Sequence, residues 1–483
     1  MVEENLDYEK LKFKSGLEIH QQLDTNKLFC NCVSVLRSDE PDLIVNRKLH
    51  AVPGELGEVD IAAQYQKSLG KEFIYQFYAN NNCLIELDEE PPHNLNQGAL
   101  KIALQVAFLL NCEIIPLTQI MRKTVIDGSN TSGFQRTVLI ARDGFIETSL
   151  GKVGIDTICL EEDSARKISE NNEKVIYKLD RLGIPLIEIA TAPDIKSPEQ
   201  AKEVALHIGE ILRSCKVKRG IGTIRQDVNL SIHGKNRVEL KGVQDMKMFV
   251  KIIYNEVLRQ KKLFDSGKPT NAEVRNVLSE GSSEFIRPMP GADRMYPETD
   301  LPLLKISREL LNEIKKNLPK LKTEIDEELK KTGLNHEMIR LLLNQDKVEE
   351  FKNLLKIYED ANFIAKMILL FPKEISAKTG KSLNKIEKIL EEIYGDVLIA
   401  LNKKKILESD VKEILTKFAK GEKFDDAIKI EKANTEEIEE KIMKIIKEKP
   451  GLNPNAYMGL IMREFHGKID GKNAMEIIKK FVK

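Results

Sequence analysis

Glu18 and His20 stand two positions apart in the segment GLEIHQQLD, which begins at Gly16. Successive side chains of a β-strand point to opposite faces, so these two polar groups share one face while Leu17 and Ile19 share the other. A carboxylate beside an imidazole can hold a cation. The segment therefore predicts a strand with a chemically active polar face.

Three later segments repeat this alternation within the first 300 residues. An ordinary solvated face would explain each strand singly, but such a face is rich in Lys, Thr and Glu of mixed sign, whereas these strands repeatedly offer Glu, Asp, Asn and His. We therefore predict that they line one shared hollow. Their polar positions are Glu188 in PLIEIA, Arg225, Asp227, Asn229 and Ser231 in RQDVNLSI, and Arg237, Glu239 and Lys241 in RVELK.

Crowded carboxylates repel one another unless cations neutralise them. Oxygen-rich groups of this kind suit Mg²⁺, which binds one or two protein carboxylates together with substrate phosphates. The chain has no GxxxxGK[ST] motif, and GIGTIRQD lacks the third glycine and the strand–loop–helix context of a dinucleotide fingerprint. The pattern predicts a phosphate ester as substrate, and ATP phosphates would have to be held by metal and by Lys or Arg.

The chain changes character near residue 305. Before this point alternating segments predominate, and after it apolar residues recur at spacings of three and four, which predicts helices. A Pro- and Gly-rich segment, KEKPGLNPNAYMG, separates a last pair of short helices. Because 483 residues exceed what one hydrophobic core supports, we expect an α+β domain at 1–304, a helical domain at 305–432 and a small tail domain at 433–483.

The composition limits the partners and the compartment. Lys plus Arg and Asp plus Glu both number 76, so any contact with nucleic acid must use a local patch. The first residues, MVEENLDYEKLKFK, are too charged for a signal peptide, and the longest apolar stretches fall short of the roughly 20 residues of a membrane helix. We therefore expect a cytoplasmic protein.

Cys30 and Cys32, in KLFCNC, have the spacing of half a zinc site. A structural zinc site needs four ligands, and no second cysteine pair follows within the next forty residues. We therefore favour free, partly buried thiols over zinc.

Seven segments resemble, in order, the signature blocks of the GatB/GatE family, the transamidase subunits of tRNA-dependent amidotransferases. DGSNTSGFQRT and MYPETD resemble the archaeal E type, because the B-type counterparts read differently. The seven segments are GLEIHQQLDTNKLFCNC, MRKTVIDGSNTSGFQRT, LEEDSARK, DRLGIPLIEIATAPD, RQDVNLSI, VELKGVQDM and RPMPGADRMYPETDLP.

This resemblance implies a cradle-shaped catalytic domain with a curved antiparallel sheet, akin to glutamine synthetase, followed by helical and tail domains. It also implies that ATP phosphorylates the side-chain carboxylate of Glu on misacylated Glu-tRNA(Gln), and that ammonia from an asparaginase-like D-type amidase displaces the phosphate to give Gln-tRNA(Gln). Phosphoryl transfer onto a carboxylate brings two anions together, which a divalent metal must neutralise. We expect ATP and Mg²⁺ as cofactors.

Site residues follow from the resemblance position by position. The metal-binding and catalytic positions match Glu18, His20, Glu162 and Glu188. Lys123 of MRKT matches a catalytic lysine on the side where ammonia enters or phosphate binds. The expected nucleotide-binding residues are Arg225, Asp227, Asn229 and Lys241. Glu161 and Asp163, which flank Glu162, are equally well explained as N-cap or surface charges.

The tail offers a basic patch around a short loop between two helices, in MREFHGKIDGKNAMEIIKK. Arg463, Lys468 and Lys472 of this patch are expected to bind tRNA phosphates, because a small helical module reads RNA by shape and backbone rather than by base edges. A solvated lysine face is the alternative.

The chain departs from the family pattern in two respects. E-type members carry a large insertion resembling a domain of bacterial aspartyl-tRNA synthetases, but only the 26-letter segment KKLFDSGKPTNAEVRNVLSEGSSEFI separates Gln260 from RPMPGADRMYPETD. The second zinc-binding cysteine pair of the B type is absent. Two other functions stay open: a free-standing carboxylate–amine ligase, which would not need the helical modules, and a non-catalytic tRNA-binding scaffold, which would not need the metal-binding residues.

Overall fold

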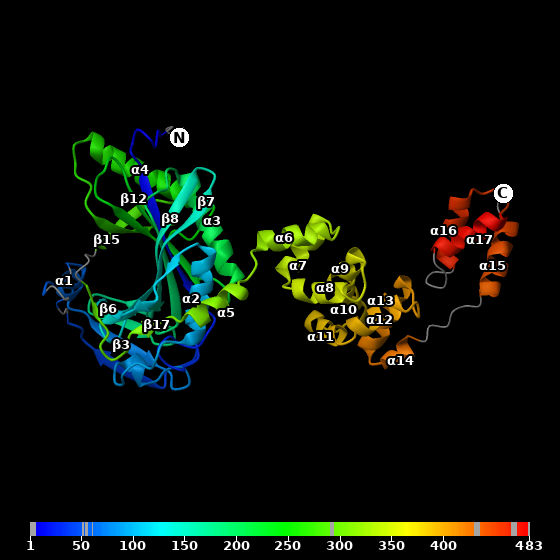
Figure 1. Ribbon diagram of the computed structural model, residues 1–483, viewed down its shortest axis with the longest axis horizontal. Helices are drawn as coiled ribbons and strands as arrows, with labels where there is room; N and C mark the ends of the chain where they lie inside the picture. The colour runs from blue at the N-terminus through cyan, green and yellow to red at the C-terminus, as the bar shows by residue number, and fades with distance from the viewer. Residues whose placement is uncertain are drawn as a thin grey trace. The chain divides into compact units, whose positions relative to one another are not determined.

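The computed structural model divides into two compact units, Met1–Leu321 and Lys322–Lys483 (Figure 1). The first unit mixes large sheets with helices, and the described part of the second is helical. This confirms the expected α+β class with a helical C-terminal region. The structure describes residues 6–50, 53, 57–59, 61–289, 294–428, 435–464 and 471–481.

A mixed eleven-stranded sheet dominates the first unit. Its strand pairs are antiparallel except for β13 and β14, which run parallel. The strand order is β15 (Ser283–Pro288), β14 (Glu273–Val277), β13 (Val238–Lys241), β12 (Ile224–Ser231), β1 (Lys14–Gln22), β11 (Pro185–Thr191), β8 (Gly151–Glu162), β7 (Phe134–Thr148), β6 (Ile120–Thr124) and β16 (Met295–Pro297), with β4 (Glu113–Ile114) paired to β7.

One face of this sheet packs against helices α2 (Gln97–Leu109), α3 (Pro198–Ser214) and α4 (Phe249–Asp265). Leu17 and Ile19 of β1 point into the shared apolar core and are almost completely buried. Helix α5 (Arg308–Lys316) packs on α2 and adds Ile314 to the same core. The alternate residues of β1, including Glu18 and His20, therefore lie on the opposite face.

A four-stranded sheet forms a second layer of this unit, in the order β2 (Leu43–Arg47), β3 (Glu72–Phe77), β10 (Lys174–Lys178) and β9 (Arg166–Glu170). Gly128, in the loop between β6 and β7, packs on this layer with a φ of +86°. A Cβ at Gly128 would lie 2.1 Å from the Phe73 ring, so only glycine fits. Further elements are α1 (Ile61–Ser68), the 3-10 helix η1 (Leu84–Leu87) and the β5 (Leu117–Thr118) to β17 (Leu304–Lys305) pair.

The second unit contains two apolar cores. Asparagine and aspartate begin several of its helices: Asn335 and Asp360 each accept a hydrogen bond from a backbone N–H three residues later. The helices around the larger core are α6 (Lys322–Lys331), α7 (His336–Asn344), α8 (Val348–Leu355), α9 (Ala361–Leu369), α10 (Phe371–Thr379), α11 (Leu383–Glu391), α12 (Tyr394–Asn402), α13 (Glu408–Lys420) and α14 (Phe424–Ala427). Those around the smaller core are α15 (Thr435–Glu448), α16 (Pro454–Glu464) and α17 (Gly471–Phe481).

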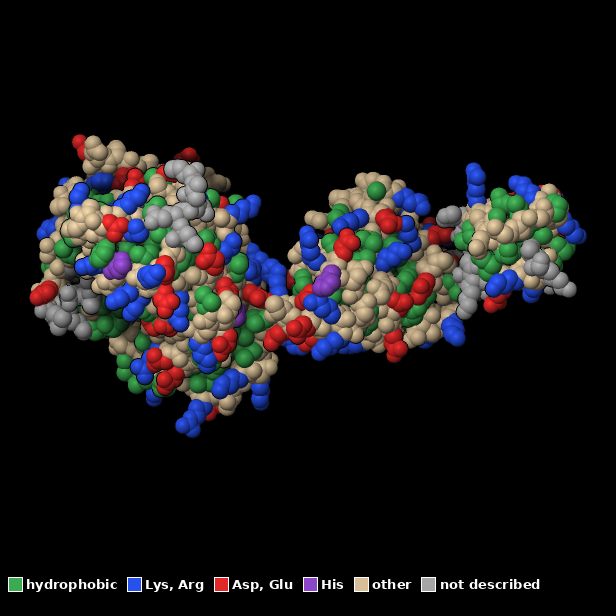
Figure 2. Space-filling view, turned by 90° about the horizontal axis from the view of Figure 1, so that it is seen from above, with side chains coloured by type: hydrophobic (Ala, Val, Ile, Leu, Met, Phe, Trp, Pro, Cys, Tyr) green, Lys and Arg blue, Asp and Glu red, His purple; other side chains and the backbone are tan. Residues whose placement is uncertain are grey.

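Charges of both signs are interspersed over the visible face of each unit (Figure 2). This mixture agrees with the equal numbers of acidic and basic residues in the sequence. Among the described residues, every helix is too short or too polar to cross a membrane.

Candidate active site

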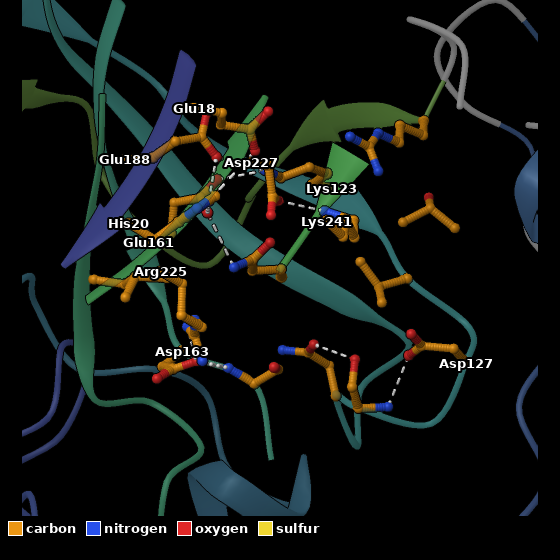
Figure 3. A pocket seen from close by; sticks show the side chains of 18 of the residues that line it. Glu18, His20, Lys123, Asp127, Glu161, Asp163, Glu188, Arg225, Asp227 and Lys241 are labelled. Carbon is orange, nitrogen blue, oxygen red and sulfur yellow. Dashed lines mark hydrogen bonds and ion pairs between the residues drawn. The ribbon is translucent and has the colours of Figure 1, made fainter. Parts of the chain in front are cut away.

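The polar face at the centre of the large sheet forms a hollow of about 480 Å³. Glu18 and His20 reach it from β1, Glu188 from β11 and Asp227 from β12 (Figure 3). The register places His20 opposite both Glu188 and Arg225, and Glu18 opposite Asp227. Directly opposite residues of antiparallel strands share a face. The pairing of three strands therefore brings these side chains together.

His20 lies at the centre of the acidic group. Its Nε2 is 3.2 Å from Glu188 Oε2, 3.4 Å from Glu18 Oε1 and 4.0 Å from Glu161 Oε2. Burial by itself lowers the pKa of His20, but the hydrogen bond to Glu188 and the charges of the three carboxylates outweigh it, so the pKa is raised. The imidazole therefore holds its proton more firmly than a free histidine does.

Lys123 of β6 supplies a buried cation. Its Nζ lies 2.5 Å from Glu161 Oε1 and 3.5 Å from Glu188 Oε2. Burial lowers the pKa of Lys123, but these two carboxylates raise it more, so the net pKa is raised and the ammonium persists. Glu161 also accepts hydrogen bonds from Thr137 Oγ1 at 2.8 Å and from Gln135 Nε2 at 3.1 Å. Lys123 and Glu161 are thus held rigidly.

A second cation, Lys241 of β13, lies on the other side of β1. Its Nζ is 2.7 Å from Asp227 Oδ2 and 2.7 Å from Glu239 Oε1. Burial lowers the pKa of Lys241, and the neighbouring carboxylates raise it above its ordinary value. Asn229 shares this face opposite Glu239, but it does not line the hollow, and its buried Oδ1 has no hydrogen-bond partner among the described residues.

Arg225 forms an ion pair with another acidic residue that lines the hollow. One of its guanidinium nitrogens lies 2.9 Å from Asp163 Oδ1, and Asp163 accepts a second hydrogen bond, at 2.6 Å, from Gln22 Nε2. Asp163 is buried and lines the hollow. It is therefore not a surface charge, which was one of the alternatives for this residue in the sequence analysis.

Two groups of these residues have the spacing of metal ligands. Within each group, one ligand atom per residue lies within 4.8 Å of the others. Burial raises the pKa of Glu18 and of Glu161, and repulsion from Glu188 raises both further, so the hollow has too little positive charge of its own. Carboxylate oxygens and one imidazole suit a hard divalent cation. The groups are Glu18, His20 and Asp227, and His20, Glu161 and Glu188.

Comparisons with known proteins agree with this geometry. Residues 13–312 match the family model of the GatB/GatE catalytic domain. The chain belongs to the GatB/GatE family. It is 37% identical to the E-type subunit of glutamyl-tRNA(Gln) amidotransferase from Methanocaldococcus jannaschii, with 99% of each chain covered. Proteins of the same name are 34% identical in Methanosarcina barkeri and 33% identical in Saccharolobus solfataricus, each over 99% of this chain.

The comparison with one relative also indicates how much of the family's length this chain lacks. The alignment with the M. jannaschii protein spans 631 positions, whereas this chain has 483 residues, so at least 148 positions (631 − 483) have no counterpart here. A gap of this size agrees with the absent insertion, which we expect between Gln260 and the block that begins at Arg287.

The fold does not bring Glu162 to the acidic group, although the family motif matches it to a metal ligand. The Glu162 carboxylate lies on the core side of β8, with Oε1 3.2 Å from Arg136 Nη1. Arg136 Nε in turn lies 2.8 Å from Glu298 Oε2, and Arg122 donates two hydrogen bonds to the same carboxylate. Glu162 thus belongs to a buried ion-pair network behind the sheet, and its neighbour Glu161 faces the hollow.

A signal for this placement was present in the sequence. Ile158 and Leu160 are fully buried on the core side of β8. Strand alternation puts Glu162 on their side, and puts Cys159 and Glu161 on the other. The alternation of CLEED and the motif match therefore give different site residues at this position.

Loops and the end of one strand supply further lining residues that the alternation of the four central segments did not indicate. Asp127, Ser129 and Asn130 come from the loop between β6 and β7, while Arg287 and Arg294 come from the end of β15 and from the residue before β16. All of them fall within the signature segments DGSNTSGFQRT and RPMPGADRMYPETD. The motifs could have indicated them, but no periodicity marks a loop.

The tail residues are only partly placed. Arg463 is exposed near the end of α16. Lys468 and the side chain of Lys472 lie outside the described residues. The tRNA-binding patch of the tail stays a prediction.

Proposed function

We propose that this chain is the transamidating subunit of a tRNA-dependent amidotransferase, which converts the Glu of misacylated Glu-tRNA(Gln) into Gln. The observation that carries the proposal is the partly buried imidazole of His20 among three carboxylates, with the Lys123 ammonium paired to two of them. Full-length similarity to E-type subunits supports the same conclusion.

ATP and Mg²⁺ are the cofactors that we propose. Mg²⁺, when bound, neutralises charge and helps to align the groups for phosphoryl transfer. The carboxylates on the hollow's face offer the hard oxygen donors that it prefers, and the raised pKa of Glu18 and of Glu161 marks the need for further positive charge. The residues that would hold it are Glu18, Glu161, Glu188 and Asp227, together with His20 once its imidazole has lost the proton.

The chain's own cations have a separate task. Lys123 and Lys241 stay charged inside the walls of the hollow, and they hold the carboxylates of β8, β12 and β13 in fixed positions. Arg287 and Arg294 line the same space, and neither forms an ion pair within the described residues. We assign the phosphates of ATP to these two guanidinium groups, because arginine matches phosphate oxygens in a bidentate manner. Arg225 is already paired with Asp163, so its guanidinium is less available to the phosphates than those of Arg287 and Arg294.

Ammonia would come from a D-type amidase as partner. Amide hydrolysis needs an activated nucleophile. Cys159 lies on the face of β8 that carries Glu161, but burial and the nearby carboxylates raise the pKa of its thiol. A thiol that keeps its proton is a poor nucleophile for amide hydrolysis. The weak nucleophile at Cys159 therefore supports a separate source of ammonia.

The same reasoning extends to the fold and the location. A large sheet with helices on one face and an acidic hollow on the other supports the cradle that is akin to glutamine synthetase. A tRNA substrate favours a cytoplasmic location.

The decisive experiment supplies purified chain with Glu-tRNA(Gln), ATP, Mg²⁺ and ammonium chloride and measures Gln-tRNA(Gln). We expect product with ammonium and none with glutamine or asparagine as the only nitrogen donor. Glu188→Gln is the matched inactive variant, because it keeps the shape of the side chain and removes its charge. Amidation of free glutamate would instead support a free-standing ligase, and tRNA binding without turnover would support a scaffold.

A further inference from the structure

A second cluster of metal-ligating side chains lies outside the hollow. One ligand atom from each of Cys30, Cys32, Cys83 and Glu86 lies within 4.8 Å of the others. From the sequence alone we predict free thiols at Cys30 and Cys32, because no second cysteine pair follows nearby. The fold brings Cys83 and Glu86 to them from about fifty residues further along, where Cys83 is the N-cap of η1 and Glu86 is its third residue.

We propose that Cys30, Cys32, Cys83 and Glu86 bind one zinc ion, with three thiolates and one carboxylate as its ligands. Zinc takes both donors in tetrahedral geometry, with bonds of about 2.0–2.3 Å, so ligand atoms lie roughly 3.5–4 Å apart. The observed cluster reaches that geometry with small side-chain movements. Soft thiolates disfavour Mg²⁺, so this site and the acidic hollow select different metals.

The backbone around the cluster is already fixed. Lys27 N donates to Cys32 O at 3.0 Å, which closes a short loop around Cys30, and Leu28 N donates to Gly183 O at 2.8 Å. Cys83 N donates to Glu86 Oε2 at 2.7 Å, which orients the carboxylate. The backbone around the ligands is therefore already in place, and metal binding has to order few further groups.

Charge at the site also favours a cation. Lys27 is fully buried, and its Nζ lies 3.2 Å from Glu86 Oε1. Three thiolates and one carboxylate carry four negative charges, which Lys27 alone cannot balance. A divalent ion leaves a net charge of about −1, which a buried site with hydrogen bonds tolerates. Without metal, the Cys30 thiol donates a hydrogen bond to Glu86 Oε1 at 3.0 Å.

The ligand set indicates a structural role. Four protein ligands complete a tetrahedral site and leave no open position for substrate. The ion would join the loop that follows β1 to η1, two segments that are distant in sequence. A disulfide between two of the cysteines is the alternative use of these thiols, but all of them are free here, and it gives no role to Glu86.

The test measures zinc in the full-length chain. The protein is purified with reductant and without chelator, dialysed, and assayed by plasma mass spectrometry; we expect about one zinc per chain. Cys83→Ser and Glu86→Gln should lose most of this zinc. Cys215→Ser is the matched control, because Cys215 is a buried thiol at the C-terminal end of α3, outside the cluster. The control should keep its full zinc content.

Cobalt provides a second readout that does not depend on the folding of a variant. Wild-type protein reconstituted with Co²⁺ should show thiolate-to-cobalt charge-transfer absorption and the visible bands of tetrahedral cobalt. Fully reduced wild-type protein that retains no zinc and shows no such absorption overturns the proposal. So does zinc retained in full by both Cys83→Ser and Glu86→Gln, or a disulfide among these cysteines found in freshly purified, metal-free protein.

Discussion

Replacing Glu161 and Glu162 separately by Gln distinguishes strand alternation from motif matching. Glu161 Oε1 lies 2.5 Å from Lys123 Nζ, and Glu161 Oε2 lies 4.0 Å from His20 Nε2. Two unit charges 4 Å apart interact by about 4 kcal/mol at an effective dielectric constant of 20. Glu161→Gln removes this interaction and one proposed metal ligand, but Lys123 keeps Glu188 at 3.5 Å.

We expect Glu161→Gln to unfold at slightly lower denaturant concentration, with a loss of about 1–3 kcal/mol, because Glu188 still compensates Lys123. Turnover should fall at least about 100-fold, which corresponds to roughly 2.7 kcal/mol in the activation barrier. Glu162→Gln should show the reverse pattern. It leaves Arg136 with one fewer carboxylate in a buried network, so stability should fall by about 3 kcal/mol and turnover by less than about tenfold.

The assay pairs single-turnover formation of Gln-tRNA(Gln), at saturating ATP and ammonium, with denaturant unfolding of the same preparations. Titration with Mg²⁺ adds a third measurement, because only Glu161→Gln should weaken the apparent Mg²⁺ affinity. If Glu162→Gln abolishes turnover with unchanged stability while Glu161→Gln stays active, the assignment from strand register is wrong and the motif match is right.

Three further predictions concern Lys241, the ion pairs of Glu298 and the tail. Lys241→Met should lower turnover by about 10–100-fold without loss of tRNA binding, because Asp227 and Glu239 lose the cation that positions them; unchanged single-turnover rates would remove Lys241 from the site. Burial raises the pKa of Glu298, but its bonds to Arg122 and Arg136 outweigh burial, so its pKa is lowered. A lowered carboxyl pKa stabilises the fold above the unfolded value of about 4.3 and loses that effect as the pH falls through the folded value. Wild type should therefore exceed Glu298→Gln by about 3 kcal/mol in unfolding free energy near neutral pH, with the difference shrinking below about pH 4, and a constant difference across this range would contradict the pairing. Removal of residues 435–483 should weaken tRNA binding and make its salt dependence shallower while ammonia-dependent turnover at saturating tRNA survives; identical salt slopes for both proteins would exclude the tail from docking.

Periodicity predicted the strands of the site well because each of them has one apolar and one polar face. Glu18, His20, Glu188, Asp227 and Lys241 all line the hollow that their alternation indicated. The motif match and the alternation disagree at Glu162, whose carboxylate pairs with Arg136 on the core side of β8.

Two classes of residue could not be found from strand alternation or from ligand spacing along the chain, for physical reasons. Arg287 and Arg294 lie in the end of β15 and in the segment before β16, where no regular strand face constrains direction. Cys83 and Glu86 reach Cys30 only through tertiary packing. Ligand spacing along the chain detects metal sites made by one or two adjacent turns and misses those that join distant segments.

The chemistry of the hollow depends on residues that never touch it. A slip of one residue between β1 and β11 would turn His20 away from Glu188, because strand faces alternate with a period of two. Backbone hydrogen bonds fix the chain on both sides of this pair: Ser15 N donates to Ile195 O at 3.2 Å, and Leu23 N donates to Pro185 O at 2.9 Å. The proposed zinc site extends the second anchor, because its first ligand follows Leu23 by seven residues. The register of these strands therefore positions the acidic group for which we propose Mg²⁺, and the proposed zinc ion would help to secure the same register.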